Sequence, residues 1–248
     1  MHIFEIDGRR YAQFERLRSN VGLTHAFSTR PHDVSIQGAE HQAARRQMVL
    51  DFGRNPAGLA CCRQIHEPHV AVVNDVDGPQ VLNRTDAVCA RNPVVTLMTF
   101  SADCPLVLLY DPRRQALGLA HASWRCTVAL IVWKLIETMG LEFDCRPQDL
   151  LAGIGPSAGP GQYEVGEDVY AAAVELPERD SCFPRRDGRM YFDLWRANRL
   201  VLEAAGVAQE NIEIAGVCTM TRTDLFYSYR REGRGCGHFC LMAGLTRE

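Results

Sequence analysis

The sequence of 248 residues has no excess of positive charge, because 27 Lys and Arg residues stand against 30 Asp and Glu, giving a net charge of −3. Nucleic acid and anionic membrane surfaces attract proteins with a clear basic excess, so we expect neither kind of partner. The longest apolar runs, such as 128–133, fall far short of the roughly 20 residues of a transmembrane helix. The N-terminal stretch also lacks an apolar signal-peptide core, which predicts a cytoplasmic, reducing compartment.

Ten cysteines are present, but no two of them form a C-x-x-C pair. The sequence therefore does not support a structural zinc ribbon or a thioredoxin-like site. In a cytoplasmic chain of this size we expect most thiols to be free and buried. A bound metal ion would have to take its ligands from distant parts of the chain.

No low-complexity linker or internal repeat divides the sequence, so we predict one domain, residues 1–248, and a monomer by default. Short aliphatic segments bounded by turn-forming residues are expected to be strands: 70–73, 94–99, 106–110, 115–120, 150–154 and 212–217. Helices are expected at 41–52, at 127–139 with a stop at Gly140, at 166–174, and at 193–205 with Asp193 at the start. This irregular alternation implies an α+β fold with a mixed β-sheet core flanked by helices.

Three segments place a histidine or cysteine at a predicted strand end or turn, where rigid scaffolds often carry functional groups. The residues are His66 in segment 64–67, Cys104 in 101–105 and His121 in 120–125. Two imidazoles and one thiolate suit zinc and leave a fourth, tetrahedral position for water or substrate. Asp103 is a candidate to orient a ligand. Single His and Cys residues are more often structural, so this spacing alone does not establish a metal site.

Two further segments have both a functional and a structural interpretation. The glycine-rich stretch 153–161 can cradle an anion with its backbone N–H groups, or it can be a tight loop that needs unusual backbone angles. In the stretch 224–231, arginines can clamp a phosphate and aromatic rings can stack on a base. From the residues alone, a strand with solvated arginines is favoured in that second stretch.

Taken together, these segments resemble one family, the laccase-domain proteins, known as multicopper polyphenol oxidases and as zinc-containing purine nucleoside phosphorylases. The family pattern reads Q-V-H-G, A-D-C-x-P, A-H-A-G-W-R-G, I-G-P-x-I-G-P-x-x-Y-E-V-G, D-L-x-x-A-N and F-F-S-Y-R-R. The corresponding stretches here are QIHE at 64–67, ADCPL at 102–106, AHASWRC at 120–126, IGPSAGPGQYEVG at 154–166, DLWRAN at 193–198 and FYSYRR at 226–231. Six matches in family order, over roughly residues 23–245, are far more specific than any one of them.

The resemblance implies a zinc ion held by His66, Cys104 and His121. It also implies phosphorolysis of purine nucleosides such as adenosine, inosine, guanosine or methylthioadenosine, with adenosine deamination as a further activity. The residues then expected to act in catalysis are the three ligands and Arg125, and those expected to bind nucleoside and phosphate are Arg230, Tyr229, Phe226 and Asp103. Copper is an alternative or adventitious metal, because nitrogen and sulfur ligands favour copper over zinc.

Three alternatives remain open from the sequence. A remoter likeness to the Cys-His deamidase domain of cytotoxic necrotizing factor toxins implies a metal-independent hydrolase, with Cys104 as nucleophile and His121 as its base. A diverged paralogue that keeps the metal but has lost catalysis is the second. Copper-dependent phenol oxidation is the weakest, because several coppers need many ligands and only two of the eight histidines lie in the matched metal motifs.

The sequence also departs from the family pattern. Glu67 replaces a glycine after the first histidine, which would put a carboxylate close to the metal, and Ser123 and Cys126 replace two further glycines. The usual Gly-Gly-Val-Ser turn reads PHDVS at 31–35, and the usual Gly-Arg near the C-terminus reads Gly-His at 237–238. None of these changes removes a predicted ligand, but several lie where substrate is expected, so the natural substrate can differ from the family's.

Overall fold

Two β-sheets that share an apolar core form the centre of the molecule, which a computed structural model describes over residues 1–246. The first sheet has the strand order β1 (His2–Ile6), β2 (Arg9–Gln13), β3 (Leu23–Ser28), β16 (Phe239–Leu245), β8 (Thr96–Ser101), β4 (Leu59–Arg63) and β6 (Gln80–Asn83). The second has the order β15 (Ile212–Ile214), β11 (Leu151–Ile154), β9 (Leu106–Asp111), β10 (Ala116–His121), β7 (Ala87–Ala90) and β5 (Val70–Val72). Each contains parallel and antiparallel pairs, so the predicted mixed sheet is present as two sheets.

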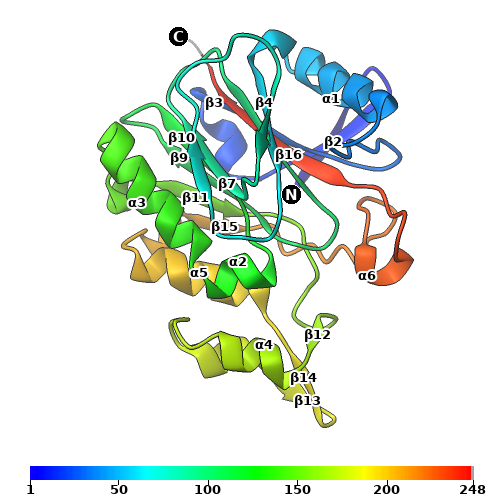
Figure 1. The fold of residues 1–248 in the computed structure, drawn as a ribbon, viewed down its shortest axis with the longest axis vertical. Coiled ribbons are helices and arrows are strands. Elements are labelled where there is room, and N and C mark those ends of the chain that lie inside the picture. Colours follow the sequence, from blue (N-terminus) through cyan, green and yellow to red (C-terminus); the bar gives the residue numbers. More distant parts are fainter. Residues whose placement is uncertain (247–248) are drawn as a thin grey trace.

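Helices cover the outer faces of both sheets, which gives four layers (Figure 1). The helix α1 (Ala39–Asp51) packs on the first sheet, and α2 (Trp124–Val128), α3 (Ile131–Phe143) and α5 (Leu194–Ala204) pack on the second. Because neighbouring residues of a strand face opposite sides, Leu97 lies in the core between the sheets and Met98 lies under α1. Burial on both faces explains why the central strands are continuous aliphatic runs.

A small three-stranded sheet and a short helix lie at the end of the molecule away from the first sheet (Figure 1). The strands are β12 (Glu164–Val165), β14 (Arg189–Tyr191) and β13 (Arg185–Arg186), and the helix is α4 (Glu167–Ala172). One further helix, α6 (Tyr229–Glu232), precedes β16. The predicted domain of residues 1–248 includes residues 247 and 248, which lie outside the described residues.

All six strands predicted from the sequence are present, with ends shifted by up to three residues, and three of the four predicted helices match α1, α4 and α5. The helix predicted over 127–139 is wrong in its bounds. Leu130 adopts a left-handed conformation with φ of 58° and separates α2 from α3. The chain also continues through Gly140 to Phe143, because the ring of Phe143 is buried in the core, and α3 ends at a left-handed Asp144 instead.

The cysteine prediction is confirmed. All ten thiols are free, seven of them are buried, and the remaining three are Cys104, Cys218 and Cys236. Across residues 1–246, no helix combines the length and the apolar character needed to span a bilayer.

Candidate functional site

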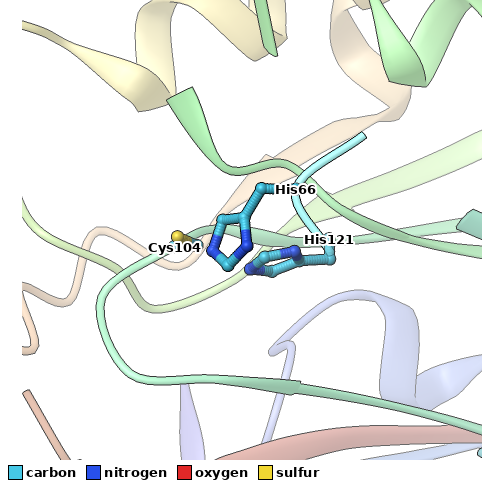
Figure 2. A group of neighbouring side chains, drawn as sticks. All are labelled: His66, Cys104 and His121. Carbon is cyan, nitrogen blue, oxygen red and sulfur yellow. The ribbon is translucent and has the colours of Figure 1, made fainter. Parts of the chain in front are cut away.

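His66, Cys104 and His121 come together at the ends of three segments that are far apart in the sequence (Figure 2). His66 lies in the turn after β4, Cys104 in the turn from β8 to β9, and His121 is the last residue of β10. One ligand atom from each residue lies within 4.8 Å of the other two. The two imidazole rings meet edge to face, with centroids 5.0 Å apart. The structure therefore juxtaposes the three side chains that the sequence singled out.

One residue of this cluster and a neighbour of another have a backbone conformation that non-glycine residues rarely adopt. His66 has φ of 63° and the neighbour of Cys104, Asp103, has φ of 97°. Non-glycine residues with positive φ are uncommon, and the strain is tolerated where surrounding contacts hold it. At Asp103 the contacts are clear, because its carboxylate accepts hydrogen bonds from Thr219 Oγ1 at 2.5 Å and from the backbone N–H of Arg230 at 2.7 Å. Asp103 thus ties the Cys104 turn to the start of α6.

Asp86, which the sequence analysis did not identify, holds two of the three side chains in place. Its Oδ1 accepts a hydrogen bond from Nδ1 of His121 at 2.9 Å and another from the backbone N–H of His66 at 3.1 Å. Its Oδ2 accepts from the N–H groups of Ile65 and Glu67. Because a carboxylate only accepts, Nδ1 of His121 carries a proton, and Nε2 is the ring nitrogen that can serve as a metal ligand. The one feature of the sequence that could have pointed to Asp86 is its position, because it is a carboxylate directly before the fully buried strand β7.

The charges in the cluster favour a thiolate. Burial alone would raise the pKa of Cys104, but the imidazoles of His121 and His66 lower it to about 7. Burial alone would lower the pKa of His121, whereas the Cys104 thiolate and Asp86 raise it to about 9. Both shifts favour a thiolate beside an imidazolium when no metal is bound, and the thiolate is the form of cysteine that binds metals and attacks electrophiles.

The donor set fits a transition metal. Around a tetrahedral zinc ion with bonds of about 2.0–2.3 Å, ligand atoms lie about 3.5 Å apart, which small side-chain rotations reach from the present spacing. Imidazole and thiolate ligands disfavour magnesium and calcium, which prefer oxygen. Glu67 does not join the cluster, because its carboxylate pairs with Arg84 at 2.9 Å and is exposed. The carboxylate expected close to the metal is therefore directed to solvent.

The cluster lines a cavity of about 860 Å³, which is large enough for a nucleoside and a small anion. Arg125, Arg230 and Arg234 contribute positive charge to its walls, and Trp124, Tyr163 and Tyr229 contribute aromatic surface. Arg125 lies over the ring of Trp124 at 4.2 Å, and Arg230 lies over that of Tyr163 at 4.8 Å. Such stacking pre-orients a guanidinium while leaving its N–H edge free for an anion.

Seven of the eight side chains that the sequence proposed for the site line this cavity: His66, Asp103, Cys104, His121, Arg125, Tyr229 and Arg230. The eighth, Phe226, does not. Its ring is 1% exposed and packs in the core between the sheets, edge-on to Phe239 at 4.9 Å. A buried ring cannot stack on a ligand, so the expected base-stacking role of Phe226 is corrected. The strand that the sequence favoured in the stretch 224–231 is also absent, because residues 229–232 form the helix α6.

The glycine-rich stretch 153–161 serves packing. The N–H groups of Gly155, Ser157 and Ala158 donate to carbonyls of Leu106, Val217 and Asp103, so they are not available to an anion. None of its glycines has a positive φ, so the unusual backbone angles are absent as well. A Cβ on Gly155 would lie 2.7 Å from the ring of Phe27 and 2.9 Å from the Leu106 carbonyl. The backbone at residue 155 therefore packs too closely against Phe27 and Leu106 to leave room for a side chain, which explains the glycine there.

Two further departures from the family pattern, Ser123 and Cys126, have structural roles. Ser123 caps the N-terminus of α2 by accepting a hydrogen bond from the Cys126 N–H at 3.3 Å. The thiol of Cys126 is buried and lies 3.7 Å from Oδ1 of Asp86. Cys126 thus adds one more contact to the carboxylate that positions His66 and His121.

Comparison with known proteins gives a consistent result. The family described as "Multi-copper polyphenol oxidoreductase laccase" matches residues 27–246. A protein of Bacteroides thetaiotaomicron named purine nucleoside phosphorylase is 32% identical, covering 91% of this chain and 92% of that protein. One of Deinococcus radiodurans with the same name is 35% identical, covering 92% and 91%.

Solved structures share the fold. The hypothetical protein YfiH of Bacillus licheniformis superposes with a TM-score of 0.84 at 26% identity, covering 90% of this chain and 93% of that one. YlmD from Geobacillus stearothermophilus superposes with a TM-score of 0.86 at 24% identity, covering 92% and 93%.

Proposed function

The chain belongs to the family described as multi-copper polyphenol oxidoreductase laccase, and from this premise we propose that it is a zinc-dependent purine nucleoside phosphorylase. One observation carries the proposal: the cluster of His66, Cys104 and His121 lines the same cavity as three arginines and the aromatic side chains of Trp124, Tyr163 and Tyr229. Two relatives named purine nucleoside phosphorylase are 32% and 35% identical to this chain, and each match covers more than 90% of both proteins. Their name supports a nucleoside and phosphate as the substrates.

Phosphorolysis requires a phosphate next to the anomeric carbon of the sugar and a place for the purine to leave. Arg125 and Arg230 are assigned to the phosphate, because a guanidinium can hold two phosphate oxygens at once. Trp124, Tyr163 and Tyr229 are assigned to the purine, whose flat rings stack on aromatic side chains. Zinc on the three ligands would supply a Lewis acid that polarises or orients a bound oxygen.

The other residues of the site position these groups. Asp86 fixes the protonated Nδ1 of His121, so that Nε2 is available as a ligand atom. Asp103 accepts from the backbone N–H of Arg230 and fixes the start of α6, which carries Arg230 and Tyr229. The phosphate-binding and base-binding groups are thus tied to the turn that carries Cys104.

A second candidate function is a metal-independent Cys-His hydrolase. It is favoured by one observation, the chain of contacts from Cys104 to His121 to Asp86, which has the form of a nucleophile, a base and an orienting acid. Phenol oxidation by several coppers has less support. Among residues 1–246, a single cluster of His, Cys and acidic side chains has metal-ligand spacing, and it holds three residues.

Product analysis tests the proposal directly. Protein of measured zinc content is incubated with adenosine, with and without inorganic phosphate, and the products are separated by chromatography. Phosphorolysis gives adenine only when phosphate is present, whereas deamination gives inosine without phosphate. His66→Ala should lose both zinc and adenine formation, and His69→Ala, at an exposed histidine nearby, should keep both. Full turnover by zinc-free protein would refute the proposal and favour the hydrolase.

A further inference from the structure

One part of the cavity wall is a chain of hydrogen bonds that the proposed mechanism does not use. It consists of Asp33 and Ser35, in the loop between β3 and α1, and His238, directly before β16. Ser35 Oγ lies 2.5 Å from Oδ1 of Asp33 and 2.9 Å from Nδ1 of His238. Both Ser35 and His238 line the cavity that contains the His66–Cys104–His121 cluster. Two of the three, Asp33 and His238, stand where the family pattern has other residues.

The positions of the protons in this chain follow from its chemistry. Asp33 can only accept, and its Oδ1 also receives the N–H groups of Ser35 and His238. Although burial opposes it, these hydrogen bonds lower the pKa of Asp33, so it is a carboxylate at neutral pH. The single hydroxyl proton of Ser35 therefore points to Asp33. Its oxygen can then only accept from the histidine, so Nδ1 of His238 carries a proton.

The second ring nitrogen of His238 remains without a partner. Within the part of the chain that the structure describes, Nε2 makes no hydrogen bond, and it is not among the buried polar atoms that lack one. It therefore faces space that solvent or a ligand can reach, on a side chain that lines the cavity. Burial and the neighbouring His121 and His41 lower the pKa of His238, although Asp33 opposes this. A neutral imidazole with a protonated Nδ1 presents a lone pair at Nε2.

This lone pair differs in kind from the three guanidinium groups of the cavity. Arg125, Arg230 and Arg234 offer only donors, which suit phosphate oxygens. An unprotonated Nε2 repels the charged, unprotonated oxygens of phosphate and attracts an N–H or O–H group instead. Uncharged donors on a purine nucleoside are its ribose hydroxyls and its amino or ring N–H groups. The guanidinium groups thus suit the charged phosphate oxygens, and Nε2 of His238 suits an uncharged donor of the nucleoside.

We propose that His238 is a specificity-determining residue, whose Nε2 accepts a hydrogen bond from an N–H or O–H donor of the bound nucleoside, and that Asp33 and Ser35 position it. This inference rests on the proposed function, because it takes the nucleoside as the ligand. It assigns nucleoside recognition to the loop between β3 and α1 and to the start of β16, and leaves the phosphate to the arginines.

Steady-state kinetics with each substrate varied in turn test the assignment. His238→Phe keeps a ring of similar size but removes the acceptor, so the KM for adenosine should rise about tenfold while the KM for phosphate stays within about twofold. His238→Gln, whose amide oxygen reaches about as far as Nε2, should restore most of the affinity. His32→Phe, at a histidine of the same loop outside the cavity, is the control. An unchanged KM for adenosine, or a rise for phosphate alone, would overturn the inference.

Nitrogen NMR of histidine-labelled protein gives a readout that a purely structural role would not affect. In the wild type, His238 should show a protonated Nδ1 and an unprotonated Nε2, and adenosine but not phosphate should shift the Nε2 resonance. Ser35→Ala should release this tautomer preference. A proton on Nε2 overturns the inference and leaves the phosphorylase activity standing.

The two proposals can also fail separately. If the wild type forms no adenine, the proposed function fails, and equilibrium dialysis with adenosine decides the inference. Weaker binding by His238→Phe than by wild type retains it. Equal binding, or no binding by the wild type, overturns it.

Discussion

Oδ1 of Asp86 accepts a hydrogen bond from Nδ1 of His121 at 2.9 Å, and both side chains are buried. The same carboxylate accepts backbone N–H groups from the turn that carries His66. One residue therefore sets the tautomer of one histidine and the backbone of the other. The geometry of the cluster of His66, Cys104 and His121 is thus a property of the folded protein and not of these three side chains alone.

We expect Asp86→Asn to lower metal affinity by about 10- to 100-fold while leaving all three ligands in place. An amide has one acceptor oxygen, and its NH₂ group would face the N–H groups of Ile65 and Glu67, which Oδ2 now accepts. The measurement is competition for zinc against a chelator of known affinity. Asp77→Asn, at an exposed aspartate, serves as the control. Wild-type zinc affinity in a folded Asp86→Asn variant would contradict this role.

The thiols of Cys104 and Cys236 line the same cavity but should differ in reactivity. Two imidazoles, acting against burial, lower the pKa of Cys104 to about 7, whereas burial and Glu232 raise that of Cys236 to about 12. In metal-free protein, alkylation of Cys104 by iodoacetamide should rise with pH to half its limiting rate near pH 7. Cys236 should stay slow until far higher pH.

Peptide mapping by mass spectrometry after timed alkylation distinguishes the two positions. Bound zinc should protect Cys104, because a coordinated thiolate is not free to attack. If Cys104 reacts equally fast with and without zinc, it is not a ligand, and the hydrolase alternative gains support.

Arg230 and Arg231 are neighbours on α6 with different surroundings. Both are exposed, but the guanidinium of Arg230 lies over Tyr163 in the cavity wall, whereas Arg231 does not line the cavity. Arg230→Met should raise the KM for phosphate by about tenfold or more, because it removes a charge-assisted contact. The backbone N–H of residue 230 can still donate to Asp103, so the helix should keep its place. Arg231→Met should leave both KM values unchanged, and an equal effect of the two variants would refute the assignment.

Sequence alone predicts six of the sixteen strands within residues 1–246. They include both edge strands of the second sheet, β5 and β15, but not the fully buried β16 at the centre of the first. β9 and β10 are found almost to the residue, because every residue of each is buried and the run is therefore aliphatic. By contrast, β1 alternates between half-buried and exposed residues and carries charge, so its composition resembles a loop. The pairing of such an edge strand depends on β2, a partner that composition does not reveal.

The same contrast holds for the site. His66, Cys104 and His121 are recognisable because each stands in a motif with its own neighbours. Asp86 precedes His121 by 35 residues and stands in no such motif, and only the pairing of β7 with β10 brings the two together. For Phe226 the motif led to a wrong prediction. It belongs to a matched motif, but its ring turns into the core while Tyr229 and Arg230 reach the cavity.

The glycines of the stretch 153–161 should differ in their tolerance of a methyl group. A Cβ on Gly155 would press against the ring of Phe27 and the backbone carbonyl of Leu106, neither of which can move without disturbing the core between the sheets. On Gly161 it would meet only the flexible end of Arg186 at 3.3 Å. We expect Gly155→Ala to lower the free energy of unfolding by about 1–3 kcal/mol and Gly161→Ala to change it by less than about 0.5 kcal/mol. Urea unfolding followed by tryptophan fluorescence measures both, and equal stabilities would show that close packing does not explain Gly155.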